Sequence, residues 1–199
     1  MGTIADEVKK CIEVMRAGGV ILYPTDTVWG IGCDATNAEA VKRVFEIKKR
    51  CDSKALLLLV DSADRLARYV GDVPAVAWDL IELSDKPLTI IYDGARNLAP
   101  NLIAEDGSVG IRVTNEMFSK ELCYRFQKAV VSTSANISGE ETPNNFSEIS
   151  PEIINAVDYV VNYKQLEKGK AKSSSIIKLT ENGTVTIIRQ GRTRSVNRI

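Results

Sequence analysis

Val131 to Gly139 reads VSTSANISG, and the rest of the chain can be interpreted outward from this stretch. Hydroxyl side chains, an amide and a closing glycine follow the apolar pair Val130 and Val131, so we expect a buried strand to end here and a polar loop to begin. At the carboxyl end of a strand in an α/β fold, backbone N–H groups and short hydroxyl side chains face a crevice where anions bind. The alternative is a turn whose side chains satisfy their own backbone. The stretch alone leaves both interpretations open.

The composition is that of a soluble globular protein. The chain has 199 residues, of which 44% are hydrophobic and 26% charged, enough for one domain with a proper core. No run approaches the roughly 18 consecutive apolar residues of a membrane span. The N-terminus lacks the basic-then-apolar pattern of a secretory signal. We therefore expect a single domain over residues 1–199, cytoplasmic and without membrane contact.

The chain contains no histidine, and this restricts the chemistry more than any other count. Ser/His and Cys/His nucleophiles, histidine proton shuttles and most transition-metal sites are excluded. The four cysteines are scattered without a CxxC pair, so we expect buried free thiols and neither a zinc knuckle nor a redox motif. Any catalysis must rely on positioning, cations and hydroxyl groups.

Positive charge is concentrated at the end of the chain, although the net charge is zero. Nine Lys or Arg and two Glu lie between Lys164 and Ile199. Such a basic end favours a polyanion partner such as RNA or a nucleotide, and equally fits a solvated, partly mobile segment. Residues 193–199 are expected to form a flexible basic tail.

Hydrophobic periodicity predicts helices and strands that alternate along the chain. We expect helices over residues 4–15, 36–47, 63–70, 73–83, 117–127 and 149–157, and strands over residues 20–23, 56–60, 88–92, 109–113, 129–132 and 158–161. Thr36 and Glu39 form a capping box for the second helix. Asn182 and Gly183 join a closing hairpin of residues 175–180 and 184–189. The pattern predicts an α/β fold with a sheet of mixed direction.

A dinucleotide fingerprint near the start of the chain is discounted. Gly30, Gly32 and Ala35 fit GxGxxA, and Asp52 lies at a suitable distance downstream. The fingerprint requires a tight turn directly after a strand, whereas Pro24 to Val28 intervene here. A Rossmann cofactor site is therefore disfavoured.

Cationic side chains supply what an anion site would need. Lys48, Arg50 and Lys54 leave the end of a helix and enter a loop, where their charges can converge on one ligand. Lys48 and Lys49 are also explained by the helix macrodipole alone. Arg112 lies on a strand, so its guanidinium points either to solvent or into a cleft. A forked donor there would suit a carboxylate or phosphate.

Six blocks of sequence together resemble a known family. In chain order they read YPTDTVWGIGCDA, IKKRxxxKALLLLV, SVGIRV, STSANISG, SSSIIKL and IIRQG, from about Gly18 to Arg192. The order and spacing are similar to those of the YrdC-like L-threonylcarbamoyladenylate synthases. The resemblance implies a single twisted mixed sheet, flanked by helices, with an open cleft. It also implies a nucleotidyltransferase that joins L-threonine, bicarbonate and ATP and releases pyrophosphate.

The same resemblance implies roles for particular residues. The catalytic set would be Lys48, Arg50, Ser134 and Asn136. The ATP-binding set would be Lys48, Arg50, Lys54, Ser108, Ser134, Thr142 and Arg189. The threonine-binding set would be Thr25, Arg112, Ser132 and Ser175. Mg²⁺ would be held mainly by ATP, with no dedicated metal site on the protein, and tRNA and downstream tRNA-modification proteins would be further partners.

Two departures and two alternatives qualify the resemblance. Cys51 and Ala55 stand where the family has prolines, which is expected to loosen the segment from Arg50 to Lys54. One alternative is a non-catalytic double-stranded RNA-binding or ribosome-associated module, favoured by the basic tail but lacking an aromatic-rich RNA motif. The other is a carbamoyl-transfer module like that of hydrogenase maturation factors, disfavoured because the chain has no room for their acylphosphatase and zinc-finger regions.

Overall fold

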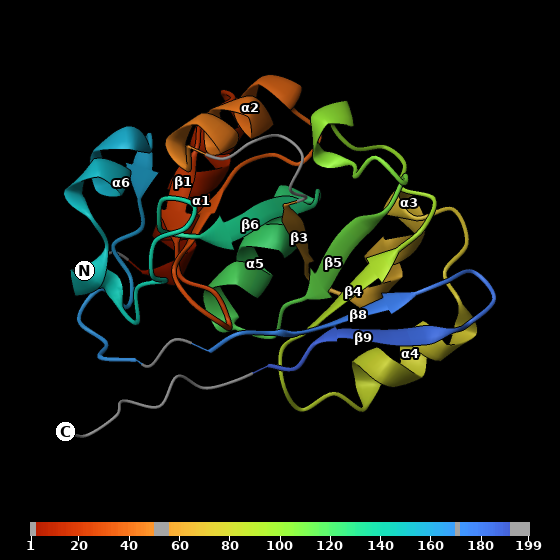
Figure 1. The fold of residues 1–199 in the computed structure, drawn as a ribbon. Coiled ribbons are helices and arrows are strands. Elements are labelled where there is room, and N and C mark those ends of the chain that lie inside the picture. The colour runs from red at the N-terminus through yellow and green to blue at the C-terminus, as the bar shows by residue number, and fades with distance from the viewer. Residues whose placement is uncertain (1–2, 50–55, 170–171, 192–199) are drawn as a thin grey trace.

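The computed structural model of the chain describes residues 3–49, 56–169 and 172–191. Within these residues the strands form a nine-stranded sheet in the order β7-β1-β2-β6-β3-β5-β4-β8-β9 (Figure 1). The strands are β1 Ile21–Tyr23, β2 Gly30–Gly32, β3 Leu57–Val60, β4 Leu88–Tyr92, β5 Val109–Val113, β6 Val130–Ser134, β7 Tyr159–Val160, β8 Ser175–Leu179 and β9 Val185–Arg189.

The strand directions confirm a mixed sheet. The pairs β1–β7, β3–β5 and β4–β8 are parallel. The pairs β1–β2, β2–β6, β3–β6, β4–β5 and β8–β9 are antiparallel. The closing hairpin is confirmed as β8 and β9, with Gly183 at a φ of +83° in the turn. The strand order was not readable from the sequence, since it depends on pairings between distant segments.

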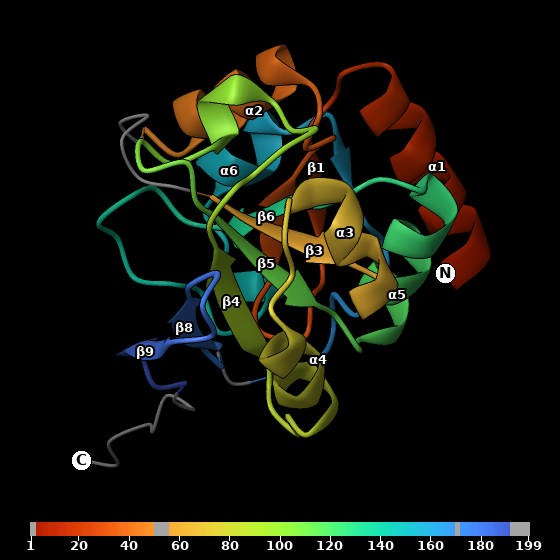
Figure 2. The same cartoon turned by 90° about the vertical axis from the view of Figure 1, so that its right-hand side faces the viewer.

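The helices cover the sheet through their apolar faces. They are α1 Ile4–Arg16, α2 Ala38–Ile47, α3 Leu66–Tyr69, α4 Ala75–Glu82, α5 Met117–Phe126 and α6 Pro151–Ala156, with short 3-10 helices η1 Ala63–Arg65, η2 Pro100–Leu102 and η3 Phe146–Glu148. The apolar residues that recur at helical spacing in α1 form a buried stripe, which includes Val8, Cys11 and Met15. Figure 2 shows α1 lying beside α5, against which it packs. None of the helices in the described ranges has the length and apolarity to cross a membrane.

Three details of the expected elements are wrong. Asn37, not Thr36, caps α2, since its side chain accepts from the N–H groups of Glu39 and Ala40. Thr36 instead donates its hydroxyl to Asp34. The helix expected over residues 63–70 is split into η1 and α3. The helix expected over residues 73–83 is shorter, since α4 covers only Ala75–Glu82 and the following Leu83 is 83% exposed.

The border between strand and loop in VSTSANISG lies further along than expected. β6 continues through Ser134, because it pairs with β3 at Ser132 and with β2 at Ser134. A strand with partners on both sides satisfies its backbone groups along this length. Since alternate residues of a strand share a face, Ser132 and Ser134 point to the same side of the sheet.

The glycines of the discounted fingerprint lie within the sheet, as part of β2. A Cβ on Gly32 would lie 2.6 Å from the ring of Tyr23, and one on Gly30 would lie 3.2 Å from the Ser132 hydroxyl. These positions are glycine because neighbouring side chains approach the backbone closely.

Candidate functional site

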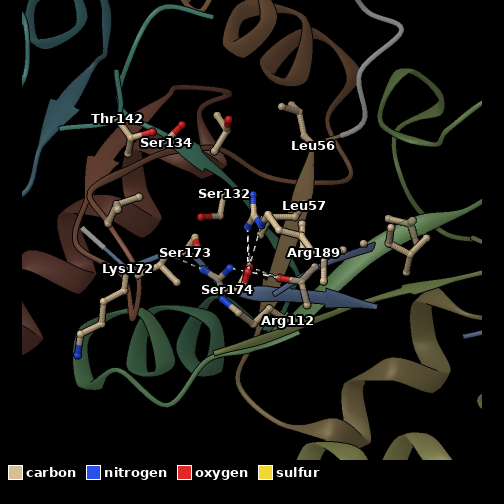
Figure 3. A pocket seen from close by; sticks show the side chains of 18 of the residues that line it. Leu56, Leu57, Arg112, Ser132, Ser134, Thr142, Lys172, Ser173, Ser174 and Arg189 are labelled. Carbon is tan, nitrogen blue, oxygen red and sulfur yellow. Dashed lines mark hydrogen bonds between the residues drawn. The ribbon is translucent and has the colours of Figure 1, made fainter. Parts of the chain in front are cut away.

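A cavity of about 350 Å³ opens on the face of the sheet to which Ser132 and Ser134 point. Its walls come from the loop after β1, the central strands β3, β4, β5 and β6, and the chain around β8 and β9 (Figure 3). The size lies in the range of small-molecule sites. The residues that line it are Thr27, Val28, Leu56, Leu57, Thr89, Ile91, Ser108, Val109, Gly110, Arg112, Ser132, Thr133, Ser134, Thr142, Lys172, Ser173, Ser174, Ile176 and Arg189.

Arg112 points into this cavity and not to solvent. It lies opposite Thr89 in the pairing of β4 with β5 and is 2% exposed. Its Nη2 lies 2.9 Å from Asp26 Oδ1 and donates to Thr27 Oγ1 at 3.2 Å. Its Nη1 donates to Thr89 Oγ1 at 3.4 Å. Its Nε is buried and has no hydrogen-bond partner in the part of the chain that the structure describes. The guanidinium is thus held on one side and retains a donor.

Asp26 balances only part of the positive charge. Burial raises the pKa of its carboxyl group, and the charge of Arg112 opposes that rise. Arg189 brings a second guanidinium to the same cavity. Burial, and then the charge of Arg112, lower the pKa of Arg189. Two like charges therefore lie close enough to affect one another, an arrangement that an anion would stabilise.

Ser174 connects Arg189 to the floor of the cavity. Arg189 Nη2 donates to the Ser174 carbonyl oxygen at 3.0 Å and to its Oγ at 3.3 Å (Figure 3). Thr89 Oγ1 donates to the same Ser174 Oγ at 3.0 Å. Ser174 and Thr89 are each 2% exposed, so this contact is shielded from bulk water.

Hydroxyl groups form the opposite side of the cavity. Ser132 and Ser134 come from β6, and Thr142 from the loop that follows; Figure 3 shows Ser134 and Thr142 across from Arg112 and Arg189. The cavity thus brings together six of the residues implied by the family resemblance, namely Ser108, Arg112, Ser132, Ser134, Thr142 and Arg189.

Lys48 is buried for a different purpose. It is 2% exposed, and its Nζ donates to the backbone oxygens of Ser134 at 2.6 Å and Asn136 at 2.7 Å. Its own carbonyl oxygen accepts from the N–H of Ser138 at 2.9 Å. In the described chain Lys48 is not part of the cavity lining. These contacts join the end of α2 to the loop after β6, and direct contact with a ligand stays a prediction.

Thr25 holds a turn beside the cavity. Its Oγ1 donates to the Val28 carbonyl at 2.7 Å and accepts from the Thr27 N–H at 3.2 Å. Such bonds to the local backbone are typical of threonine at a turn. Thr25 therefore shapes the segment that presents Thr27, and its predicted contact with threonine is untested.

Asn136 and Ser175 also bond locally. Asn136 Nδ2 donates to the carbonyls of Ile137 at 2.9 Å and Glu140 at 3.0 Å, as in an asparagine that stabilises a turn, while its Oδ1 is buried without a hydrogen-bond partner among the described residues. Ser175 Oγ accepts from the Gly191 N–H at 3.0 Å. VSTSANISG thus contains features of both interpretations. Its strand residues Ser132 and Ser134 line the cavity, and its loop residue Asn136 stabilises a turn.

Two of the implied residues cannot be placed. Arg50 and Lys54 lie outside the described residues, as does the tail at 193–199. Their roles in binding ATP, and the catalytic role of Arg50, stay predictions.

Sequence reasoning missed six polar residues of the cavity, which are Thr27, Thr89, Thr133, Lys172, Ser173 and Ser174. Thr89 carried a signal, because it interrupts the apolar run of β4, which reads LTIIY. Ser174 lies at the centre of a run of three serines, of which only Ser175 was predicted to bind a substrate. A polar residue in a central strand needs a buried partner, and that requirement could have identified Thr89.

The arrangement suits anion binding better than nucleophilic catalysis. Burial raises the pKa of the Cys33 and Cys123 thiols far above neutrality, so these side chains stay protonated. No group of three or more His, Cys, Asp or Glu residues capable of holding a metal ion occurs among the residues that the structure covers. Guanidiniums and hydroxyls can hold phosphates and carboxylates and stabilise the charge that develops on them.

Comparison with solved structures establishes the fold. YciO of E. coli superimposes with a TM-score of 0.81 at 24% identity, covering 98% of this chain and 93% of that chain. Sua5 of P. abyssi, solved as a complex with L-threonine, gives a TM-score of 0.79 at 22% identity over 86% of this chain and 50% of that chain. This chain thus spans about half the length of that Sua5 structure.

Sequence comparison establishes the family. Residues 13–191 match the Sua5/YciO/YrdC family model, whose description is "Telomere recombination". Threonylcarbamoyl-AMP synthase of Pseudoalteromonas translucida is 34% identical over 177 residues, which make up 87% of this chain and 93% of that relative. Because the family model covers most of the chain and this relative matches over nearly its whole length, the chain belongs to the Sua5/YciO/YrdC family.

Proposed function

We propose that this chain catalyses the formation of L-threonylcarbamoyladenylate from L-threonine, bicarbonate and ATP. The threonine amine and bicarbonate condense to a carbamate with loss of water. A carbamate oxygen then attacks the α-phosphorus of ATP, the bond to the β-phosphate oxygen breaks, and pyrophosphate leaves. Neither step requires a protein nucleophile, which agrees with the absence of histidine and with the protonated thiols of Cys33 and Cys123.

The cavity with its two guanidiniums is the observation that carries this proposal. Arg112 and Arg189 lie on one side, and the hydroxyl residues Ser134 and Thr142 on the other. The reaction brings together a carboxylate, a carbamate and a triphosphate, which repel one another in water. Positioning them against fixed cations and hydrogen-bond donors can contribute several kcal/mol to lowering the barrier.

The relatives support this choice of substrates. The P. translucida relative carries the name threonylcarbamoyl-AMP synthase, and the P. abyssi Sua5 structure contains L-threonine. In this chain we propose that Arg112 binds the threonine carboxylate, because its Nε–H has no acceptor among the described residues. We propose that the nucleotide binds on the side of Arg189. A forked guanidinium binds both kinds of anion well.

Mg²⁺ is proposed to arrive with ATP. The groups that line the cavity are mostly hydroxyls and cations, and Asp26 beside them is paired with Arg112. Such a donor set does not fit a dedicated Mg²⁺ site, since that ion takes carboxylate, carbonyl and water oxygens. The triphosphate would provide its ligands, and the metal would neutralise phosphate charge.

Pyrophosphate release tests the proposal directly. Purified protein is incubated with Mg²⁺ and ATP, and release is measured with both L-threonine and bicarbonate, with each alone, and with neither. We expect release only when both are present, together with a threonine-containing adenylate identified by mass spectrometry. Release that is unchanged when threonine is omitted would contradict the proposal.

A matched pair of variants separates the cavity from the rest of the surface. Arg112→Met should abolish threonine-dependent release. Arg125→Met removes an equally long cation from the exposed face of α5 and should leave release unchanged. Equal activity of the two variants would show that the cavity is not the site of the reaction.

We also propose that the product passes to proteins that modify tRNA. The adenylate is a mixed anhydride that water hydrolyses, so an acceptor must follow in the reaction sequence. Adding tRNA and the downstream enzymes should convert the adenylate into modified tRNA and increase AMP release. Tight tRNA binding without any adenylate formation would instead favour the non-catalytic RNA-binding alternative.

A further inference from the structure

Two hydroxyl groups connect the two guanidiniums across the floor of the cavity. Arg112 Nη1 donates to Thr89 Oγ1 at 3.4 Å, and Thr89 Oγ1 donates to Ser174 Oγ at 3.0 Å. Arg189 Nη2 donates to the same Ser174 Oγ at 3.3 Å. We call the hydroxyls of Thr89 and Ser174 the hydroxyl bridge. It joins residues of four strands or strand ends that are far apart in the sequence.

A guanidinium only donates, so each hydroxyl must accept the hydrogen of the arginine beside it. A hydroxyl has two lone pairs and one hydrogen, so it can accept from an arginine and still bond to the other hydroxyl. In the structure Thr89 is the donor of that second bond and Ser174 the acceptor. Each guanidinium thus has an acceptor hydroxyl beside it, and the two hydroxyls are joined to one another.

Thr89 is the more rigid half of the bridge. It is 2% exposed and lies in β4, which pairs with β5 on one side and β8 on the other. The register places Thr89 opposite Arg112 in β5 and opposite Ile176 in β8. A β-branched side chain in a central strand has little freedom at χ1. Its hydroxyl is therefore a fixed point between the two arginines.

The fixed position of the Thr89 hydroxyl matters because the two guanidiniums repel one another. The charge of Arg112 contributes to the lowered pKa of Arg189, so the two groups interact across the cavity. Asp26 and Thr27 hold Arg112 on its other side, and the Ser174 carbonyl oxygen also accepts from Arg189. An acceptor oxygen beside each guanidinium keeps both directed into the cavity before the substrates bind, which reduces the cost of binding.

We propose that Thr89 is a positioning residue that holds Arg112 and Arg189 ready for their two substrates through the hydroxyl bridge. The inference rests on the proposed function for its assignment of threonine to Arg112 and of ATP to Arg189. It adds that one buried hydroxyl in the floor of the cavity governs the affinity for both.

Thr89→Val tests the proposal, because it replaces the hydroxyl by a methyl group of similar shape. Calorimetric titration with ATP and with L-threonine, each alone and in the absence of turnover, should give Kd values about 3- to 10-fold higher for both ligands, the scale of the net contribution of one typical hydrogen bond. Thr89→Ser keeps the hydroxyl and should restore both Kd values. Thr186→Val makes the same change on exposed β9 and should alter neither.

A second substitution tests the bridge from its other end. Ser174→Ala should raise both Kd values as Thr89→Val does. The double variant should be no worse than either single variant, because both changes break the same connection. If Thr89→Val folds poorly, the single variant Ser174→Ala still tests the proposal, and unchanged Kd values in that variant would overturn it.

Three further results would overturn the proposal. They are Kd values unchanged in Thr89→Val, an increase for one ligand only, and a Thr89→Ser variant as impaired as Thr89→Val. The last result would assign the effect to packing of the methyl group. The proposed function fails separately, when wild-type protein binds both ligands but releases no pyrophosphate, and the Kd comparison still tests the bridge.

Discussion

Lys48 and Arg112 are equally buried cations with opposite orientations. Each is 2% exposed. Lys48 Nζ is directed at the protein itself, 2.6 and 2.7 Å from the backbone oxygens of Ser134 and Asn136. Arg112 faces a cavity, and its Nε is buried without a partner in the described ranges. Both positions would be marked as functional by burial and charge alone.

The difference lies in what receives the donated hydrogens. A buried cation is costly unless its hydrogens are accepted, and carbonyl oxygens can satisfy that need without a ligand. Lys48 thereby fixes the loop on which Asn136 lies. Arg112 keeps a donor for a molecule that enters the cavity. From this contrast we infer that Lys48 stabilises the loop that shapes the site, whereas Arg112 binds the ligand. The predictions below test that inference.

Lys48→Met should have the largest effect. Methionine fills a similar volume but leaves the carbonyl oxygens of Ser134 and Asn136 without their donor. Each such loss costs about 1–3 kcal/mol, so the free energy of unfolding measured in urea should fall by roughly 2–5 kcal/mol. Pyrophosphate release should be lost as well, because the loop after β6 moves.

The control for this variant lies on the same helix. Lys42→Met changes an exposed lysine of α2 and should leave both stability and turnover unchanged. If Lys48→Met is as stable as wild type yet inactive, Lys48 contacts a ligand directly and the contrast with Arg112 is wrong.

Arg112→Lys should give the opposite result. Lysine keeps a positive charge beside Asp26, so the free energy of unfolding should change little. It cannot reproduce the forked donors, and loss of one preorganised donor commonly lowers kcat by about 100-fold or more. Steady-state kinetics with varied threonine, beside urea denaturation, would separate the two quantities. A fall in stability comparable to that of Lys48→Met would make Arg112 structural.

Gly191→Ala should perturb the cavity from its serine side by an intermediate amount. A Cβ here would lie 2.5 Å from the Ser173 carbonyl oxygen and 2.9 Å from the Ser175 nitrogen, so the segment carrying Ser174 must shift. We expect a loss of about 1–3 kcal/mol in stability and a higher KM for ATP, since Arg189 bonds to Ser174.

Gly183→Ala is the matched control for that substitution. Gly183 has a φ of +83° and no atom within 4 Å of an added Cβ. Its replacement costs roughly 1–2 kcal/mol of left-handed strain without moving the serine segment. The two alanine variants should therefore be similarly destabilised, and only Gly191→Ala should raise KM. Equal KM values for the two variants would show that the segment carrying Ser174 does not affect ATP binding.

Most of the fold was predictable from local patterns. The stripe on α1, the apolar runs of β3 and β5 and the turn at Asn182 and Gly183 each depend on residues close in sequence. The strand order and the length of β6 were not predictable. The hydrogen bonds that extend β6 to Ser134 come from β2, about a hundred residues earlier in the chain.

The candidate site was predictable in its residue types and not in its contacts. Hydroxyls and arginines at the right blocks pointed to Ser132, Ser134 and Arg112. The bond from Lys48 to Ser134 spans 86 residues, and that from Thr89 to Ser174 spans 85. Such contacts depend on how elements distant in the sequence pack together, so the sequence could suggest that Lys48 is functional but not what its Nζ contacts.

Lys178 is a third cation and provides the smallest test of the comparison. It lies on β8, and its side chain is 31% exposed. Its Nζ lies 2.9 Å from Asp106 Oδ2 and 3.4 Å from Asp93 Oδ1, so its hydrogens go to carboxylates and not to carbonyl oxygens or a ligand. Asp106 also accepts from Ser108 Oγ at 2.5 Å. The bond from Ser108 first, and that from Lys178 next, lower the pKa of Asp106 to about 2.

The lowered pKa fixes the sign of the expected pH dependence. The contribution of Asp106 to stability is fully present above its ordinary pKa of 3.8 and is lost as the pH falls through about 2. Because the pair is exposed, Asp106→Asn should lower stability near neutral pH by only about 0.2–1 kcal/mol, and the difference should vanish near pH 2. NMR titration of the carboxyl group measures the pKa itself. A value near 3.8 would mean that Asp106 does not hold the Ser108 hydroxyl, which would then be available to a nucleotide, as the family resemblance implies.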